Sequence, residues 1–403
     1  MTDSTPKIAV LRLIGLSLGL TLILSGCSTT AGTPIGEAAQ DKTLTMVWWG
    51  NANEEAALHA ELDNIVQLGG PQVNVEVIGV TPNENDISRR LKDGNRPDIV
   101  RTGNPQQFEK DSVDLHLDDG FWPQTELARR RGGKDGNDMA APYDVTMTTT
   151  WINQDAFAKA GVQAASPSLP WTSWGQLLHD ADIVRQHAGI KFALAIEDDP
   201  QTIISVASSF GADAFAKDQK TVSWAKEPVK QSLEMIKNGV GAGLIAEEPF
   251  KKTTSAKEIF DSGQAAVYVG PGRLIGNQSA KLVANPCEQR CGGLPSVSYL
   301  VAFSDGGKDV VEKLTTLAAD TRRAEATGEL PAHLVLDPDT VRPRIAELAS
   351  SSKELLLSGM SPAMARLDSR FTECLTPYLD AKTTSDEVTK EMRQALESAG
   401  NSN

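Results

Sequence analysis

Segments with the pattern of β-strands alternate with helical segments in the first part of this chain, and this order restricts the possible fold more than any other feature. Residues 44–49, 73–80 and 96–100 are short apolar or β-branched runs. Helical patterns at residues 53–67 and 86–92 separate them. Strand, helix and strand in this order indicate a parallel sheet with helices on both faces, so we expect an α/β fold.

A second strong local signal lies at the centre of the chain. Residues 143–151 are rich in Thr, Val and aromatic residues, which predicts extended structure. A short helix is expected next, with Asn153 as its N-cap and Gly161 at its end. Further helices are expected at residues 173–186, 201–210, 227–238 and 308–320, and further strands at residues 192–196 and 297–303.

The size and charge of the chain limit its class. A single hydrophobic core rarely grows beyond about 250 to 300 residues, and this chain has 403 residues, so we expect two domains. Hydrophobic residues make up 40% and charged residues 23%, as in typical globular proteins. The formal net charge of -14 argues against nucleic acid as a partner and against binding of anionic lipid through the surface.

The first 26 residues have the features of an export signal. Lys7 and Arg12 give a positively charged start, and an apolar run extends from Leu13 to Leu24. A helix of this length spans about 18 Å, which is short of a hydrocarbon core of about 30 Å. The run therefore predicts a signal peptide, residues 1–26, and not a membrane span.

The end of this signal, Leu24-Ser-Gly-Cys27, resembles a bacterial lipobox. The resemblance implies that the thiolate of Cys27 is alkylated by a diacylglycerol, which would anchor the protein to the membrane. The alternative is an ordinary signal peptide followed by a chance cysteine. Residues 27–42 are small and polar and predict a flexible tether.

The remaining cysteines predict a disulfide. Exported proteins meet an oxidising environment, and Cys287 and Cys291 would close a small loop; Cys374 could pair with either. The five histidines are scattered without a His-Glu-x-x-His pattern, so no zinc site is expected. No cofactor is expected, because the mature sequence has no phosphate-binding G-x-x-x-x-G-K-[ST] loop.

Several segments together resemble the extracellular solute-binding proteins (family 1, carbohydrate type) of ABC importers. WINQDAFAKAGV, residues 151–162, and PWTSWGQLLHDA, residues 170–181, resemble the family's first crossover between two lobes. KDGNRPDIVRTGN, residues 92–104, resembles a first-lobe signature. Residues 259–272 match F-x-x-G-x-A-A, where a helix turns at glycine into a strand that ends at the ligand cleft. The resemblance covers residues 43 to 398.

The resemblance implies a two-lobed, periplasmic-binding-protein-like fold of type II, with a sheet flanked by helices in each lobe and a hinge between them. Residues 43–145 and 294–340 would form the first lobe, and residues 146–293 and 341–403 the second. Ligand contacts both lobes only when they are closed, so binding shifts the population from open to closed.

The function that the resemblance implies is binding without catalysis. The protein would capture a small polar solute, with a carbohydrate as the first choice, and deliver it to the transmembrane subunits of an ABC permease. We expect a monomer, lipid-anchored on the outer face of the bacterial cytoplasmic membrane.

Candidate ligand-binding residues follow the strands whose ends would face the cleft, or lie at the crossover and in the tail. They are Trp49, Asn51, Asn53, Glu54, Asn104, Tyr143, Asp144, Asp198, Trp224, Tyr268, Gly272, Arg273 and Arg366. Aromatic rings and polar groups of these types recognise the faces and hydroxyls of sugars. Trp48 and Trp49 are consecutive, so one is expected on each face of the first strand.

Each of these residues also has a purely structural interpretation. Asn51, Asn53 and Glu54 can cap the following helix, and Tyr143 and Asp144 can serve the hinge. The others can belong to a solvated turn, to the core or to a surface salt bridge.

The identity of the solute is left open by the sequence. Maltose-binding relatives often place Trp where this chain has Gly272, followed by Arg273, and only 5% of the residues are aromatic. A sugar, a polyol, a phosphorylated glycerol compound or another small polar solute would fit. The alternatives are an exported lipoprotein hydrolase acting on envelope glycans, with Asp144 paired with Glu197 or Asp198, and a binding protein that signals to a sensor.

Overall fold

The computed structural model describes most of the chain after the expected tether. The described residues are 43–79, 84–122, 125–132, 136–166, 169–216, 221–271, 277, 279–291, 293–333, 364, 367 and 370–401. The predictions for the signal peptide, the tether, Cys27, Gly272, Arg273 and Arg366 lie outside these residues. In the described part, no helix combines the length and the apolar character needed to cross a membrane.

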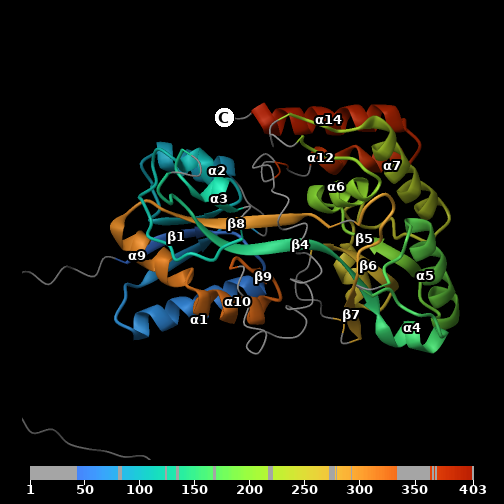
Figure 1. Cartoon of the computed structure of the whole chain (residues 1–403), viewed down its shortest axis with the longest axis horizontal. Helices are drawn as coiled ribbons and strands as arrows, with labels where there is room; N and C mark the ends of the chain where they lie inside the picture. The colour runs from blue at the N-terminus through green and yellow to red at the C-terminus, as the bar shows by residue number, and fades with distance from the viewer. Residues whose placement is uncertain are drawn as a thin grey trace, which may run out of the picture. The chain divides into compact units, whose positions relative to one another are not determined.

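Helices and strands alternate along the chain as expected (Figure 1). The strands are β1 (Leu44–Trp48), β2 (Val73–Val77), β3 (Ile99–Thr102), β4 (Ala141–Asn153), β5 (Phe192–Ile196), β6 (Ala265–Pro271), β7 (Ala280–Val283), β8 (Pro295–Ala302) and β9 (Leu330–Pro331). The helices are α1 (Ala52–Gln67), α2 (Glu84–Lys92), η1 (Pro105–Phe108), α3 (Glu126–Arg129), α4 (Gln154–Ala160), α5 (Trp174–Ala188), α6 (Pro200–Ser209), α7 (Lys226–Gly241), α8 (Ala256–Asp261), α9 (Asp305–Leu314), α10 (Leu317–Thr327), α12 (Arg370–Glu373), α13 (Leu375–Leu379) and α14 (Ser385–Asn401).

The strands form one mixed sheet in the order β2-β1-β3-β8-β4-β6-β5, and β7 and β9 also pair with β4. The pairs of β1 with β2 and with β3 are parallel, as the alternating pattern predicts. β8 comes from much later in the chain and lies antiparallel between β3 and β4. The order of strands and helices in the sequence predicted the parallel part but not this insertion.

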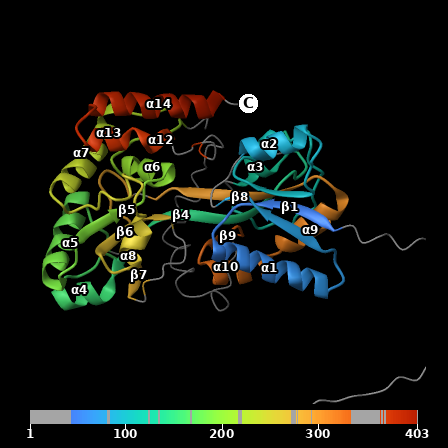
Figure 2. The same cartoon turned by 180° about the vertical axis from the view of Figure 1, so that it is seen from behind.

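Strand β4 crosses between two lobes, each an α/β unit (Figures 1 and 2). Its residues 141–147 pair with β8, whereas residues 148–153 pair with β6 and β7. We call the elements around β1, β2 and β3 the first lobe and those around β5, β6 and β7 the second lobe. The predicted two-lobed α/β fold is therefore confirmed, while the predicted assignment of residue ranges to the lobes stays a prediction.

A β-bulge in β4 changes which face its side chains occupy. The pairing with β8 skips Tyr143, because Pro142 pairs with Tyr299 and Asp144 with Ser298. Ala141 before the bulge and the bulged residue Tyr143 pack in the apolar cluster that contains Trp48. After the bulge, Val145 packs in the cluster on the opposite face. An extra residue in a strand inverts the alternation of its side chains, which explains this switch.

The apolar cores follow this division. One cluster fills the first lobe between the sheet and α1 and α9, and another fills the second lobe and includes the tail helices, which pack near α7 (Figure 1). A third cluster continues along one face of β4, through Met147 and Trp151, to Phe260 and Tyr268. The two lobes are therefore connected through this apolar cluster on one face of the sheet as well as through the backbone of β4.

Local signals in the sequence placed several helix ends correctly. Asn153 caps α4 and Gly161 ends it in the left-handed conformation, while Ser173 caps α5. The N-cap of α1 is Asn51, not Asn53, because Asn51 forms a capping box with Glu54. The single helix expected at residues 308–320 is wrong: α9 ends at Leu314, and Thr316 caps the separate helix α10. Strand β7 was not predicted.

The predicted disulfide between Cys287 and Cys291 is present, and Cys374 is a free, buried thiol. The loop that the disulfide closes contacts two helices. Glu288 accepts a hydrogen bond from the backbone N of Trp174 at the start of α5 (3.0 Å), and Arg290 donates to the carbonyl of Ser208 near the end of α6 (2.6 Å).

Replacing both disulfide cysteines, Cys287→Ser with Cys291→Ser, should lower the free energy of unfolding by about 2 kcal/mol, because a small closed loop no longer restricts the unfolded chain. Urea unfolding with and without a dithiol reductant measures this change. The reductant should destabilise the wild type and leave the double variant unaffected. Equal stability of the two proteins without reductant would contradict the prediction.

Candidate functional site

The candidate residues of the first lobe gather where the ends of β1 and β3 meet the crossing strand β4. Trp49, Glu54, Tyr143 and Asp144 all surround one side chain, that of Arg101 on β3. Arg101 is 1% exposed. We call these five residues, with Trp48 and Ser298, the arginine cluster.

The guanidinium of Arg101 is satisfied by groups from several elements. Nη2 donates to Glu54 Oε1 (2.9 Å) and to Asp144 Oδ2 (2.6 Å). Nη1 donates to the carbonyl of Trp49 (2.7 Å), and Nε donates to Ser298 Oγ (3.1 Å). Burial alone would lower the pKa of Arg101, but the carboxylates of Asp144 and Glu54 raise it above its ordinary value. The cluster therefore keeps a buried cation between two carboxylates.

Aromatic rings enclose the same guanidinium. Its carbon lies 4.4 Å from the centre of a ring of Trp48 and 4.0 Å from that of Trp49. The sequence predicted one tryptophan on each face of the first strand; β1 ends at Trp48, so Trp49 lies beyond the strand, and both rings contact the same guanidinium. The indole nitrogen of Trp49 donates to the carbonyl of Arg101 (2.9 Å), and the side chain is 8% exposed.

The side chain of Ser298 positions Asp144 together with Arg101. Both carboxylate oxygens of Asp144 are engaged, because Ser298 Oγ donates to Oδ1 (2.8 Å) while Arg101 binds Oδ2. Burial raises the pKa of the neighbouring Tyr143 to about 12, so its hydroxyl stays protonated at neutral pH. Asp144 is thus held through both oxygens, and the neighbouring Tyr143 stays neutral.

Three further candidates lie around the cluster in different environments. Asn51 is half-buried and its side chain caps α1, whereas Asn53 is exposed on the first turn of that helix. Asn104 is buried immediately after β3, and its backbone N donates to Thr102 Oγ1 (2.9 Å). Asn53 has the most accessible amide of the three.

The acidic residues after β5 have structural partners. Asp198 forms an ion pair with Lys252, and Asp199 caps α6 by accepting from the backbone N of Thr202 (3.0 Å). Glu197 accepts from the backbone N of Lys257 at the start of α8 (3.1 Å). Burial, and next the charge of Asp199, raise the pKa of Glu197 to about 7.

The two aromatic candidates of the second lobe lie in apolar cores. Trp224 packs edge-on against Phe371 with 6.0 Å between ring centres, and Tyr268 lies 5.8 Å from Phe260. Both are fully buried. Their positions support the alternative interpretation, that they are core residues, and neither presents an exposed ring face to a ligand.

The structure therefore brings together the first-lobe and crossover candidates but does not bring Trp224 or Tyr268 to them. Arg101 was missed by the sequence reasoning, although one signal was available. A charged residue inside an otherwise buried strand needs buried partners of opposite charge, and Glu54 and Asp144 were already candidates.

We also searched the described residues for a metal site and for surface pockets. Among the described residues, no group of three or more His, Cys, Asp or Glu side chains could hold a metal ion. A surface pocket of about 480 Å³ lies beside α9, lined by His116, Leu117, Asp118, Asp309, Glu312, Lys313, Thr315 and Thr316. It contains none of the residues that the sequence singled out.

No protein-family model matches the chain. No curated protein matches its sequence. Solved structures, in contrast, match it over most of its length. The GacH receptor of Streptomyces glaucescens GLA.O, solved without ligand and in complex with acarbose and an acarbose homolog, is 17% identical with a TM-score of 0.70; the match covers 89% of this chain and 98% of that one.

Two further structures are similar to the same extent. Maltose-bound MalE3 of T. maritima is 15% identical with a TM-score of 0.73, over 88% of this chain and 99% of that one. The ABC substrate-binding protein Lmo0181 from Listeria monocytogenes, in complex with cycloalternan, is 14% identical with a TM-score of 0.73. The match covers 88% of this chain and 98% of that one. The chain therefore has the two-lobed fold of these proteins.

Replacing Arg101 by methionine should lower the free energy of unfolding by about 3 to 5 kcal/mol, because Glu54 and Asp144 would be left as buried carboxylates without a cation. The matched control is Arg322→Met. Arg322 is 52% exposed and pairs with Glu61, and exposed pairs contribute about 1 kcal/mol or less. Urea unfolding compares the two variants, and equal losses would contradict a central role for Arg101.

Stability should fall as the pH rises from about 5 to about 8, in part because of Glu197. Its pKa is raised from an ordinary value of 4.5 to about 7, so between these values the unfolded chain has lost the proton that the folded chain keeps. The contribution is present below pH 4.5 and is lost as the pH passes 7; it is on the order of 3 kcal/mol. Unfolding of Glu197→Gln, measured at both pH values, should show a smaller fall than the wild type. An identical pH dependence would contradict the assignment.

Proposed function

We propose that this protein captures a small polar solute, most readily a carbohydrate, between its two lobes and delivers it unchanged to the permease of an ABC importer. The observation that carries the proposal is strand β4, which crosses between two separately built lobes and has an array of polar and aromatic groups at its first-lobe end. The similar structures with maltose, acarbose and cycloalternan support a sugar as the ligand.

The arrangement of the site suggests a division of roles among its residues. Glu54, Tyr143 and Asp144 are buried and engaged with one another through Arg101, so they support the strand ends from beneath. The groups available for hydrogen bonds to sugar hydroxyls are then the amides near the surface, first of all the exposed Asn53 and next the half-buried Asn51, whereas Asn104 is buried. Trp49 is 8% exposed, and the accessible part of its side chain would contact the sugar ring.

The mechanism requires only a change of population. A solute that binds groups on both lobes stabilises the closed arrangement over the open one, and the permease can distinguish the two. The resemblance of residues 1–27 to a lipoprotein signal supports export and an anchor at Cys27, which would keep the protein at the outer face of the membrane. The solute could also be a polyol or a phosphorylated glycerol compound.

Hydrolysis is a weaker explanation of the same residues. Asp144 binds Arg101 and Ser298, and Asp198 binds Lys252, so both carboxylates are held by cations in structural contacts. A glycosidase requires a pair of carboxyl groups that face the substrate with different protonation states. The similar structures are also binding proteins and not enzymes.

A thermal-shift screen against maltose, maltotriose, tagatose and glycerol 3-phosphate tests the proposal. At a hundred times its Kd a ligand adds about 2.7 kcal/mol to the free energy of unfolding, which raises Tm by a few degrees. A sugar should give this shift and be recovered intact by chromatography. Cleaved sugar would favour the hydrolase, and a shift with none of the probes would contradict the proposed ligand class.

A pair of variants then tests the site. Asn53→Ala should weaken binding of the stabilising sugar about 5- to 30-fold, as expected for the loss of one or two hydrogen bonds. The control is Asn238→Ala, because Asn238 is also an exposed helical asparagine but lies on α7, away from the arginine cluster. Equal affinities of the two variants, measured by calorimetry, would remove Asn53 from the site.

A further inference from the structure

We propose that Arg323 is a positioning residue for ligand binding: it holds the bulged residue Tyr143 and so keeps the first-lobe end of the crossing strand in the conformation that the site requires. This inference rests on the proposed function for its consequence, but its structural part can be tested without a ligand. Arg323 lies on α10, far in the sequence from Tyr143 on β4. Its side chain is buried, with 3% exposed.

The bulge creates the need for such a residue. Tyr143 has no partner residue in the ladder between β4 and β8, because the pairing passes from Pro142 to Asp144. The bulge leaves Tyr143 out of the ladder with β8 only, because β9 pairs beside it, Asp144 with Pro331 and Val145 with Leu330. Nη2 of Arg323 donates to the carbonyl of Tyr143 and so holds the residue that the ladder with β8 omits.

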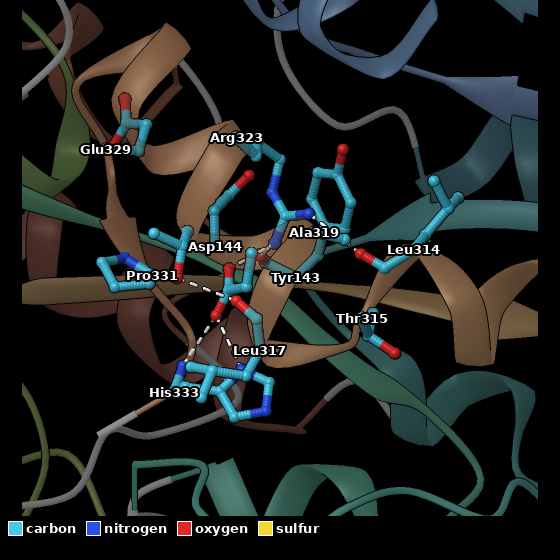
Figure 3. A network of polar contacts seen from close by, with 12 residues as sticks. Tyr143, Asp144, Leu314, Thr315, Leu317, Ala319, Arg323, Glu329, Pro331 and His333 are labelled. Carbon is cyan, nitrogen blue, oxygen red and sulfur yellow. Dashed lines mark hydrogen bonds and ion pairs between the residues drawn. The ribbon is translucent and has the colours of Figure 1, made fainter. Parts of the chain in front are cut away.

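The same guanidinium also packs on the side chain of Tyr143. Its carbon lies 3.6 Å from the centre of the ring (Figure 3). The guanidinium of Arg101 lies 5.5 Å from the same ring centre. Tyr143 is therefore held through both its backbone and its ring, while its own hydroxyl is buried without a hydrogen-bond partner in the described part of the protein. Tyr143 is held by what surrounds it and not by its hydroxyl.

Arg323 is itself fixed by its surroundings (Figure 3). Nη1 donates to the carbonyl of Leu314 (3.0 Å) at the end of α9, and Nη2 also contacts Asp320 Oδ1. The other oxygen of Asp320 accepts from the backbone N of His333 (2.9 Å) and lies 2.8 Å from its Nδ1. Asp320 and His333 are both buried. The contacts thus connect α9, α10 and the segment after β9 to one point of β4.

Two buried arginines then anchor adjacent residues of the crossing strand. Arg323 binds the carbonyl of Tyr143, and Arg101 binds the carboxylate of Asp144. This part of β4 cannot bend without breaking charged hydrogen bonds in the interior, which are stronger than neutral ones. Bending during lobe closure is then confined to residues 145–148, where the pairing of β4 changes from β8 to β6.

Hydrogen–deuterium exchange of Arg323→Lys tests the structural part. Lysine keeps the charge but cannot bind Leu314, Asp320 and Tyr143 in one plane. Exchange in residues 141–147 should become at least tenfold faster, while exchange in β6, residues 265–271, stays unchanged. The matched control is Arg322→Lys on the same helix, whose guanidinium is exposed and binds Glu61 (2.7 Å); it should change neither segment. Equal exchange of residues 141–147 in the two variants, or equal acceleration in β6, would overturn the inference.

Calorimetry with maltose tests the consequence for binding. Arg323→Lys should bind at least tenfold more weakly than the wild type, and Arg322→Lys should bind equally well. If the wild type and Arg323→Lys bind maltose with equal affinity, Arg323 is not a positioning residue. If the wild type binds neither maltose nor any other sugar, the proposed function fails, and the exchange experiment alone decides the role of Arg323.

A second variant is available in case Arg323→Lys does not fold. Asp320→Asn removes the charge that holds Arg323 and is expected to give the same local acceleration of exchange.

Discussion

The backbone hydrogen bonds of β4 are the constraint on which the rest of the structure depends. One continuous strand of 13 residues completes the sheet of the first lobe with its first half and that of the second lobe with its other half. Each lobe therefore has its own helices and core, yet neither sheet is complete without the same strand. The apolar cluster along one face of β4 reinforces this connection, so relative motion of the lobes must occur as bending within the sheet.

Buried charge is concentrated at one end of this strand. Arg101 and Arg323 occupy positions beside Asp144 and Tyr143, and each has acidic partners, Glu54 and Asp144 for one and Asp320 for the other. Burying charges is costly unless they are paired and hydrogen-bonded. These buried charges orient the strand: the bulge and the two arginines fix the end of β4 that lies at the candidate ligand groups. A binding site built on strand ends needs such support, because a ligand that closes two lobes must meet preformed contacts.

The fold was largely predictable from the sequence because its signals are local. The alternation of strands and helices, the caps at Asn153 and Ser173, and the close spacing of Cys287 and Cys291 each depend on neighbouring residues. The insertion of β8, the bulge at Tyr143 and the pairing of β7 depend on partners distant in the chain, which a single sequence does not reveal. In the site, Glu54 was predicted after the first strand and Tyr143 and Asp144 at the crossover, and all three contact Arg101; Arg101 and Arg323 themselves were missed. Trp224 and Tyr268 were expected to face a ligand because aromatic residues recognise sugars, although burial of large rings in a core is equally favoured by their size.

The proposed function requires that the two lobes joined by β4 close around a solute and leave it intact. Small-angle X-ray scattering, with and without the sugar that most stabilises the protein, measures this most directly. We expect a smaller radius of gyration at saturating sugar, with the sugar recovered unchanged. An unchanged radius of gyration at demonstrated saturation, or recovery of cleaved sugar, would contradict it.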